Sequence, residues 1–355
     1  MQNQIRGEEE MKKLLSMFLV LVMVLTSVFG MTACGNGDGG NSTTGNEVIE
    51  MKISHIASES DPIHMGWSFL KEQLEERSDG RIKVTIYSNK ALSNSNNEDA
   101  EKVQQNIVQM TSVPTSSLAA IGNIQEYQVF DYPYLFETNE DFYTVLDSEL
   151  AQGWSDRLTS AAGVKALGGY SLGWLSVGSV KKLGTLKDYK GQKIRTLSSD
   201  LQMQTVNAYG ASATQINYGE CYTALQQGTV DGILTSTGLF VSDKFMEVID
   251  ELAVAKPTAL LHVPIVNAEW YEALPEDLKV VYDECIVDYL AAVRQYEADF
   301  DAEALKTIAD SGVKVIEYTD AELGEFKAAT ESVYEKYADI AGQETIDAVR
   351  TILGK

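Results

Sequence analysis

The chain has 355 residues, of which 44% are hydrophobic and 23% charged, a composition typical of a globular protein large enough for two domains. Aspartate and glutamate number 52 against 28 lysines and arginines, so the formal net charge is −24, which argues against nucleic acid as a partner. Three cysteines without a Cys-x-x-Cys spacing and three widely separated histidines give no basis for a zinc site. We expect neither a metal nor a cofactor.

The first residues have the pattern of a targeting segment. A pair of lysines at 12–13 precedes an apolar run over 14–25, which is the order of a secretory signal peptide. The following Met31-Thr32-Ala33-Cys34 resembles a bacterial lipobox, in which the cysteine is lipidated and becomes the first residue of the mature protein. A plain transmembrane anchor over 14–33 is the alternative, because that stretch is about long enough to span a bilayer.

We therefore interpret 1–33 as a signal peptide, with Met11 as the suspected true start, and 34–47 as the lipidated cysteine and a Gly/Ser/Asn-rich flexible tether. A lipid on Cys34 would hold an extracytoplasmic protein at the outer face of the cytoplasmic membrane. The other cysteines, Cys221 and Cys285, could pair in that compartment, and the alternative is two buried thiols.

From residue 48 onward, strand and helix patterns alternate. Apolar periodicity and turn residues predict, in chain order, a strand at 49–53, a helix through Trp67, Leu70 and Leu74, a strand at 81–87, a helix at 97–107 and a strand near 108–113. The middle of the chain repeats the theme with strands near 164–170, 192–196 and 229–234 and helices at 199–209 and 218–227. This alternation predicts an α/β fold with a parallel or mixed sheet and a second lobe.

The last third of the chain is mainly helical. One helical pattern runs over 275–309, with apolar residues at three- and four-residue spacing, and its length suits a helix that braces two lobes. A short strand at 313–318 and a final amphipathic helix from about 320 to 341 follow.

One arginine stands where an α/β sheet binds its ligand. Arg195 ends a short strand and precedes a helix in which Ser199 and Gln202 fit a capping box. A guanidinium there, beside the N–H groups of a helix N-terminus, can bind a carboxylate through two parallel hydrogen bonds. The alternative is a structural arginine paired with one of the chain's many carboxylates. Six arginines follow residue 48, and Arg195 is the best placed of them.

Several runs of the chain are similar to a known family. Lys190-Gly191-Gln192-Lys193-Ile194-Arg195 and the block from Tyr218 to Gly232, which contains Tyr222-Thr223-Ala224-Leu225-Gln226-Gln227-Gly228 and Val230-Asp231-Gly232, closely resemble the DctP-type solute-binding proteins of TRAP transporters. Supporting matches include Phe130-Asp131-Tyr132-Pro133-Tyr134-Leu135-Phe136. The resemblance covers about residues 50–340.

The resemblance implies a two-lobed, periplasmic-binding-protein-like fold with a central cleft. We expect lobe I to comprise 48–172 plus about 261–299, and lobe II 173–260 plus about 300–355. The lobes would close on a small organic acid and present it to the membrane-embedded TRAP subunits. The receptor is expected to be a monomer and not an enzyme.

The resemblance also assigns roles to residues of the cleft. Arg195 would hold the carboxylate, Tyr218 would be the aromatic contact, and Thr235 stands where the family usually has an asparagine. A second arginine found in many members falls on Leu175 here, so a monocarboxylate is favoured over a dicarboxylate, because a second buried carboxylate would lack a cation. Weaker candidates that border the predicted crevice are Ser198, Tyr170, Ser112 and Thr115.

Trp174, Leu175, Ile233 and Leu234 would make one end of the cleft apolar if they face it, and the alternative is that Leu175 and Ile233 pack behind the site. Two other functions stay open. An ABC-type sugar- or polyol-binding lipoprotein would not need Arg195, and a secreted enzyme or sensor would need a positioned acid, base, nucleophile or metal.

Overall fold

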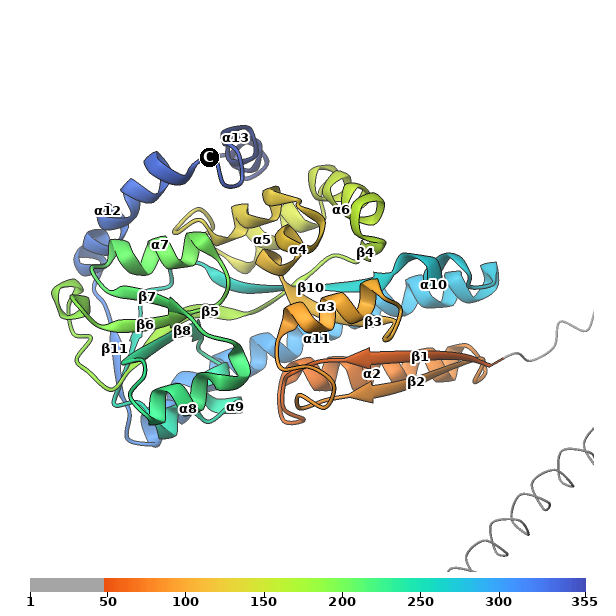
Figure 1. Ribbon diagram of the computed structural model, residues 1–355, viewed down its shortest axis with the longest axis horizontal. Coiled ribbons are helices and arrows are strands. Elements are labelled where there is room, and N and C mark those ends of the chain that lie inside the picture. Colours follow the sequence, from red (N-terminus) through yellow and green to blue (C-terminus); the bar gives the residue numbers. More distant parts are fainter. Residues whose placement is uncertain (1–47) are drawn as a thin grey trace, which may run out of the picture. The chain divides into compact units, whose positions relative to one another are not determined.

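All strands of the described chain join in one mixed sheet. A computed structural model describes residues 48–355, and its sheet has the order β2-β1-β3-β10-β5-β8-β6-β7, with β4, β9 and β11 paired off this path (Figure 1). The α/β fold with a mixed sheet, expected from the alternating pattern, is confirmed by this sheet and its covering helices. The expected signal peptide, Cys34 and the expected tether lie outside the described residues.

The first half of the sheet contains the early strands of the chain. Strand β1 (Ile49–Ser54) pairs in parallel with β2 (Ile82–Tyr87) and β3 (Met110–Pro114), and its alternation buries Met51 and Ile53. The helices of this part are α2 (Pro62–Arg77), α3 (Asn96–Gln104), α4 (Thr115–Gly122), α5 (Asn139–Leu146), α6 (Glu149–Ala162) and α10 (Ala268–Glu272), with a 3-10 helix η1 (Gln125–Asp131).

The second half repeats the parallel arrangement. Strand β6 (Lys193–Thr196) lies between β7 (Ser212–Gln215) and β8 (Gly232–Ser236), parallel to both. Strand β11 (Lys314–Glu317) pairs in parallel with β9 (Glu251–Val254). The helical segments of this half are α7 (Asp200–Ala208), α8 (Cys221–Gln226), α9 (Leu239–Ser242) and the 3-10 helices η2 (Leu186–Tyr189), η3 (Tyr218–Glu220) and η4 (Phe245–Glu247).

Two long antiparallel strands connect the halves. Strand β10 (Ala259–Asn267) pairs with β3, with the short β4 (Val164–Ala166) and with β5 (Tyr170–Ser179), which in turn pairs with β8 and β9. The sequence pattern did not predict β10, because all nine of its residues are buried and the strand therefore lacks an apolar–polar alternation.

A single helix of 35 residues, α11 (Glu276–Asp310), packs on both halves. It contacts α2 on one side and β5, α9 and β11 on the other, over a length of about 50 Å. The predicted apolar face is buried, and the ring of Tyr289 stacks on Trp67 of α2 at 4.7 Å. The brace predicted over 275–309 is therefore present, one residue further along the chain.

The Val-Asp-Gly motif at 230–232 links the strands β5, β6 and β8 through hydrogen bonds and close packing. Asp231 accepts a hydrogen bond from the backbone N–H of Lys193 at 2.8 Å and pairs with Lys181, while its own carbonyl accepts from Val180 N and Ser179 Oγ. A Cβ atom on Gly232 would lie 2.5 Å from the carbonyl oxygen of Gly178 on β5. The glycine therefore allows the close approach of β8 to β5.

The C-terminal segment differs from the expected single helix. Helix α12 (Asp320–Tyr337) ends earlier, and a further helix, α13 (Gln343–Ile352), follows Gly342, whose φ of +88° interrupts the helix. Val333 and the α13 residues Ile346 and Val349 pack in one core cluster with aromatic residues of η1 and α5. Part of the segment assigned to lobe II thus packs on elements assigned to lobe I.

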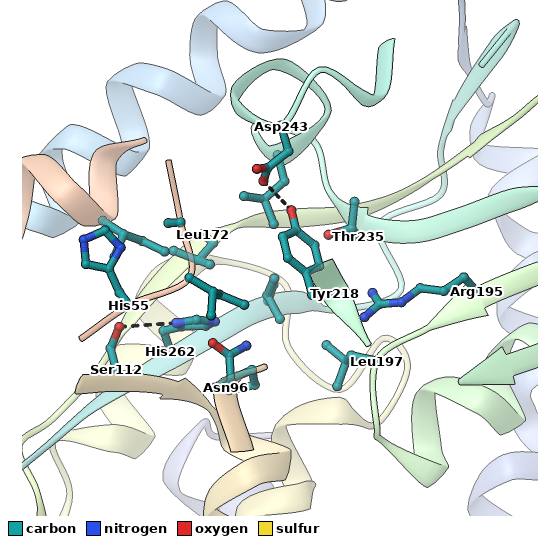
Figure 2. Close-up of a pocket in the computed structure, with 16 residues that line it drawn as sticks. His55, Asn96, Ser112, Leu172, Arg195, Leu197, Tyr218, Thr235, Asp243 and His262 are labelled. Carbon is teal, nitrogen blue, oxygen red and sulfur yellow. Dashed lines mark hydrogen bonds between the residues drawn. The ribbon is translucent and has the colours of Figure 1, made fainter. Parts of the chain in front are cut away.

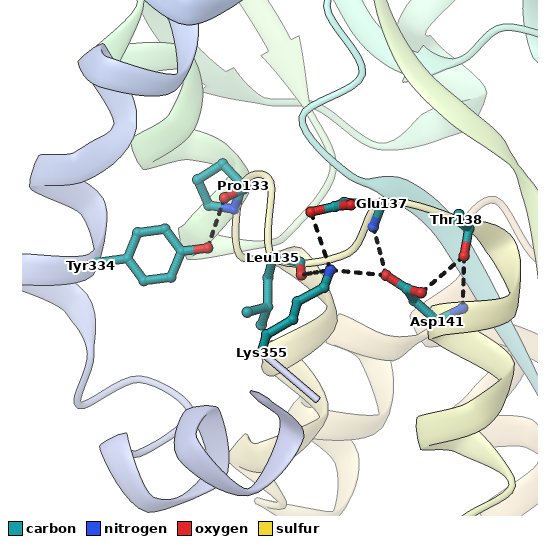
Figure 3. Close-up of polar contacts among 7 residues, drawn as sticks. All are labelled: Pro133, Leu135, Glu137, Thr138, Asp141, Tyr334 and Lys355. Carbon is teal, nitrogen blue, oxygen red and sulfur yellow. Dashed lines mark hydrogen bonds and ion pairs between the residues drawn. The ribbon is translucent and has the colours of Figure 1, made fainter. Parts of the chain in front are cut away.

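Polar contacts add to this packing. Figure 3 shows the Tyr334 hydroxyl donating to the Pro133 carbonyl at 2.7 Å and the Lys355 ammonium beside Leu135, Glu137 and Asp141, at 3.0 Å from the Asp141 carboxylate. Because Lys355 is partly exposed, we expect its ion pairs to contribute little to stability.

Two further observations bear on the sequence interpretation. Cys221 and Cys285 are free and buried, which agrees with the alternative of two buried thiols. Within residues 48–355, no helix combines the length and the apolar character that crossing a bilayer requires.

Tyr334→Phe should lower the free energy of unfolding by about 1 kcal/mol, because it leaves the Pro133 carbonyl without its donor while preserving the ring. Urea unfolding of the full chain measures this difference. The matched control is Tyr296→Phe on α11, whose hydroxyl makes no hydrogen bond within the described residues. Equal effects of the two substitutions would contradict the contact.

Candidate ligand-binding site

A cavity lies where strands of both halves of the sheet end. It has an empty volume of about 550 Å³, and Figure 2 shows the residues around it. His55 follows β1, Pro114 ends β3, Leu197 follows β6 and Thr235 is the penultimate residue of β8. Ligands of open α/β sheets bind at the carboxyl ends of parallel strands, and the sequence predicted the crevice at such a place.

Arg195 is the one charged donor of this cavity. Its side chain is 3% exposed, its Nε donates to the Ile216 carbonyl at 3.0 Å, and its guanidinium lies 5.5 Å from the ring centroid of Tyr218. Burial lowers the pKa of the guanidinium, so the surrounding protein favours its charge less than water does.

The other arginines show what is unusual about this one. Each of the remaining five in residues 48–355 forms an ion pair with an aspartate or glutamate; they are Arg77, Arg81, Arg157, Arg294 and Arg350. Arg195 forms none within that range, although it is strongly buried in an acidic chain. A structural arginine would have a carboxylate partner, so this geometry favours the ligand-binding interpretation.

Tyr218 and Asp243 form one wall beside the arginine. The Tyr218 hydroxyl donates to Asp243 Oδ2 at 2.5 Å, and both residues line the cavity together with Thr235 (Figure 2). Burial raises the pKa of Asp243, against the opposing effects of the Tyr218 hydrogen bond and Lys90. Burial also raises the pKa of Asp61, the N-cap of α2, to about 6, and nearby Asp243 adds to the shift.

Neutral polar groups occupy the other end of the cavity. His262 of β10 contacts the Ser112 hydroxyl through Nδ1 at 3.4 Å, and Ser112 shares a 2.6 Å hydrogen bond with Tyr170. His55 Nε2 lies 3.2 Å from His64 Nδ1. Burial lowers the pKa of His262 to about 3, and burial together with His64 lowers that of His55 to about 3, so both cavity imidazoles are neutral near pH 7.

The predicted site residues occupy different positions relative to this cavity. Four of them line it: Arg195, Tyr218, Thr235 and Ser112. Ser198 lines an adjoining pocket that shares Arg195 and Tyr218. Tyr170 is fully buried behind Ser112. Thr115, at the start of α4, is buried and does not line the cavity.

Trp174 faces away from the cavity, and a β-bulge explains why. The register between β5 and β10 shifts between Ala259–Trp174 and Leu261–Ser171, and Gly173 has a φ of +95°. A residue inserted in one strand reverses which face the following side chains occupy. Leu172 therefore lines the cavity, whereas the Trp174 ring packs on Phe142 at 5.5 Å.

The apolar residues expected near the second arginine position also lie elsewhere. Leu175, Ile233 and Leu234 are at most 1% exposed and do not line the cavity, which for Leu175 and Ile233 agrees with the alternative that they pack behind the site. Other apolar side chains line the cavity: Ile56, Ala57, Ile63, Pro114, Leu172, Leu197, Leu239 and Leu260. The cavity is thus largely apolar, but through residues that the sequence did not single out.

The helix after Arg195 is capped differently from the prediction. Ser199 accepts the Gln202 backbone N–H, as a cap should, but the Gln202 side chain donates to Asp131 rather than back to Ser199. Ser199 also donates to Asp131, at 2.8 Å. The buried Asp131 carboxylate therefore binds the start of α7 to η1, and this helix end does not line the cavity.

Sequence reasoning missed His55, Asn96, Asp243 and His262 as cavity residues. The two histidines are 207 positions apart, so only the pairing of β10 beside β3 brings His262 to the end of β1. The available signal was that His55 stands two residues after the strand predicted at 49–53. Within residues 48–355, no group of three or more His, Cys, Asp or Glu side chains is arranged to hold a metal ion.

His262→Gln should make stability less sensitive to acid. A histidine whose pKa is lowered in the folded state binds fewer protons when folded than when unfolded. Its contribution to the free energy of unfolding is therefore present above the unfolded pKa of about 6.5 and is lost as the pH falls toward 3. Between pH 7.5 and pH 5 the wild type should lose about 2 kcal/mol through this residue alone. Asp61 acts in the opposite direction, because its raised pKa favours the folded state as the pH falls through 6.

Urea unfolding of both proteins at pH 7.5, 6 and 5 measures the effect. The variant should be less stable than the wild type at pH 7.5 by an amount that shrinks at pH 5. Parallel pH curves for the two proteins would show that His262 does not carry this sensitivity.

The chain is similar to proteins of known kind over most of its length. The model of the DctP family, described as bacterial extracellular solute-binding protein, family 7, matches residues 53–340. A C4-dicarboxylate-binding periplasmic protein DctP of Rhodobacter capsulatus is 27% identical over 305 residues, covering 86% of this chain and 91% of that protein.

Solved structures of similar proteins have the same fold. A TRAP periplasmic solute-binding protein of Shewanella oneidensis with bound succinate superposes with a TM-score of 0.81 at 25% identity, covering 86% of this chain and 99% of that one. A sugar acid binding protein of Advenella mimigardefordensis in complex with galactonate has a TM-score of 0.83 at 24% identity, with 87% and 98% covered, and supports the fold. The sequence resemblance is thereby confirmed: this chain belongs to the DctP family of bacterial extracellular solute-binding proteins.

Proposed function

We propose that this protein is an extracytoplasmic receptor that captures a small organic acid by closing two lobes and delivers it to TRAP membrane subunits. The observation that carries the proposal is the buried guanidinium of Arg195, which lacks a carboxylate partner in the described chain and lines the cavity at the strand ends. A ligand carboxylate is the group that best satisfies it, through charge-assisted hydrogen bonds.

The proposed ligand has one carboxylate rather than two. Arg195 is the only lysine or arginine among the residues that line the main cavity, and the position of the second family arginine holds the buried Leu175. A dicarboxylate would place its second charge among the neutral histidines at the other end, where no lysine or arginine lines the cavity to compensate the cost of burial.

The lobes of the proposal are 48–172 plus about 261–299, and 173–260 plus about 300–355. The cavity supports this division, because His55 and Ser112 come from one part and Arg195 and Thr235 from the other. A Cβ on Gly219 would lie 3.3 Å from the Asn94 carbonyl, so the two parts also touch directly. We propose a monomer that binds its ligand without turnover.

In the alternative of an ABC-type receptor, the cavity would bind a neutral sugar or polyol. A neutral ligand would leave Arg195 without a counter-charge, so this alternative is not favoured. An enzyme that used the same cavity would convert the bound acid, which the mass measurement below would reveal.

Arg195→Ala should abolish retention of the natural ligand. The full chain is purified and denatured, and any released small molecule is identified by mass spectrometry. We expect an organic acid from the wild type and none from the variant, whose Kd for that acid should rise about 100-fold or more, or roughly 3 kcal/mol, because a buried charge pair is removed.

The matched control is Arg157→Ala, which removes a surface arginine paired with Glu126 and should leave the ligand bound. A neutral sugar retained equally by wild type and Arg195→Ala would overturn the proposal and favour the ABC-type alternative.

We also propose that the receptor is a lipoprotein anchored through Cys34 after removal of the signal peptide 1–33. Cys34→Ser should abolish lipidation, because the thiol is the acyl acceptor, and the protein should then be released or remain unprocessed. Membrane fractionation and intact mass measure both outcomes. Unchanged mass and unchanged membrane retention in the variant would contradict lipidation at this residue.

A further inference from the structure

The end of the cavity away from Arg195 has a distinct chemistry. Figure 2 shows His55, Ser112 and His262 gathered on the side opposite Arg195. The strand order agrees, because β10, which carries His262, is separated from β6, which carries Arg195, by β5 and β8. Three strand spacings of about 4.8 Å place the two backbones about 14 Å apart.

The polar groups at this end are held in place by contacts behind the cavity. Tyr170 hydrogen-bonds Ser112 at 2.6 Å, and Ser112 contacts His262 Nδ1 at 3.4 Å. In the register of the sheet, His262 lies between Pro114 of β3 and Tyr170 of β5. These contacts orient the ring, and a ring oriented in advance lowers the entropy cost of binding a ligand there.

Hydrogen-bonding capacity remains at these side chains. His262 Nε2 makes no hydrogen bond within the described residues, whereas the His55 ring contacts His64 Nδ1 through Nε2 and also interacts with the Ala57 backbone. Polar atoms inside proteins are normally paired, so the unpaired His262 nitrogen on the cavity wall indicates a place for a ligand group. Both rings are neutral near pH 7, as described above, and each can act as a donor or an acceptor but not as a counter-charge.

Building on the proposed function, we propose that His55, Ser112 and His262 form a neutral subsite that receives a hydroxyl or oxo group at the far end of the ligand. The cavity thereby selects a hydroxy- or oxo-monocarboxylate over both a dicarboxylate and a plain alkyl acid. His262 is its specificity-determining residue. Neither an alkyl end nor a second carboxylate suits this subsite: the first leaves the polar atoms unpaired, and the second brings a charge without a cation.

Matched acids test this rank order. Isothermal titration calorimetry of the full chain at pH 7.5 compares butanoate, 4-hydroxybutanoate and succinate, and then hexanoate, 6-hydroxyhexanoate and adipate. Within the better-bound series, the hydroxy acid should bind at least 10-fold more tightly than the diacid and the alkyl acid, because a site built to hydrogen-bond a hydroxyl rejects analogues that lack it.

Two variants test the residue. His262→Leu should reduce the advantage of the hydroxy acid over the alkyl acid at least five-fold while changing the Kd of the alkyl acid less than three-fold. His262→Gln keeps a neutral hydrogen-bonding group and should restore part of that advantage. Equal weakening of every acid by His262→Leu would overturn the specificity role, since a structural role affects all ligands alike.

Failure of this inference is distinguishable from failure of the proposed function. If Arg195→Ala abolishes binding but the diacid binds best to the wild type in both series, the neutral subsite is refuted and the receptor for organic acids stands. If Arg195→Ala leaves every affinity unchanged, or if none of the six acids binds, the result counts against both.

Discussion

A guanidinium removed from water needs a partner, and much of this binding site can be understood from that requirement. Arg195 has the Ile216 carbonyl and the face of the Tyr218 ring, which orient it, but no carboxylate in the described chain to balance its charge. The other arginines pair at the surface, where pairing costs little and contributes little. Inside, the unbalanced charge favours an anionic ligand and makes an empty cavity the less stable state. In the proposed function, the carboxylate of the ligand supplies this missing charge from within the cavity.

The rest of the cavity makes that single charge selective. Strands β5 and β10 run between the two halves of the sheet, so side chains of both halves meet along them. The bulge at Gly173 decides which side chains of β5 those are: it directs Leu172 inward and Trp174 toward Phe142. His262 on the neighbouring strand faces the cavity as a neutral ring. One end of the site therefore carries a charge, while the other offers hydrogen bonds within an apolar surround.

Some motifs that identify the family stabilise the sheet, and others line the cavity. Asp231 and Gly232 hold β5, β6 and β8 together, and Gln192 binds Ser179 and the carbonyls of Lys182 and Asp188. None of these three residues lines the cavity. Arg195 and Tyr218 do line it, and in the proposed function they bind the carboxylate end of the ligand. The resemblance is consequently informative about the fold and about acid binding, and says little about the far end of the ligand, whose walls come from His55, Ser112 and His262.

The sequence by itself determined the α/β class, the long bracing helix and the position of Arg195 at a strand end, because apolar periodicity and strand–helix order are local properties that burial enforces. The absence of a second arginine at Leu175 stays a prediction about the ligand. Strand β10 escaped prediction, because a strand buried on both faces has no alternation to recognise. The orientation of Trp174 depended on a one-residue bulge, and the placement of His55 and His262 on one cavity depended on the pairing of β10 with β3, strands about 150 residues apart. Those features were decided only by the tertiary structure, since register and strand order arise from contacts that no local stretch of sequence contains.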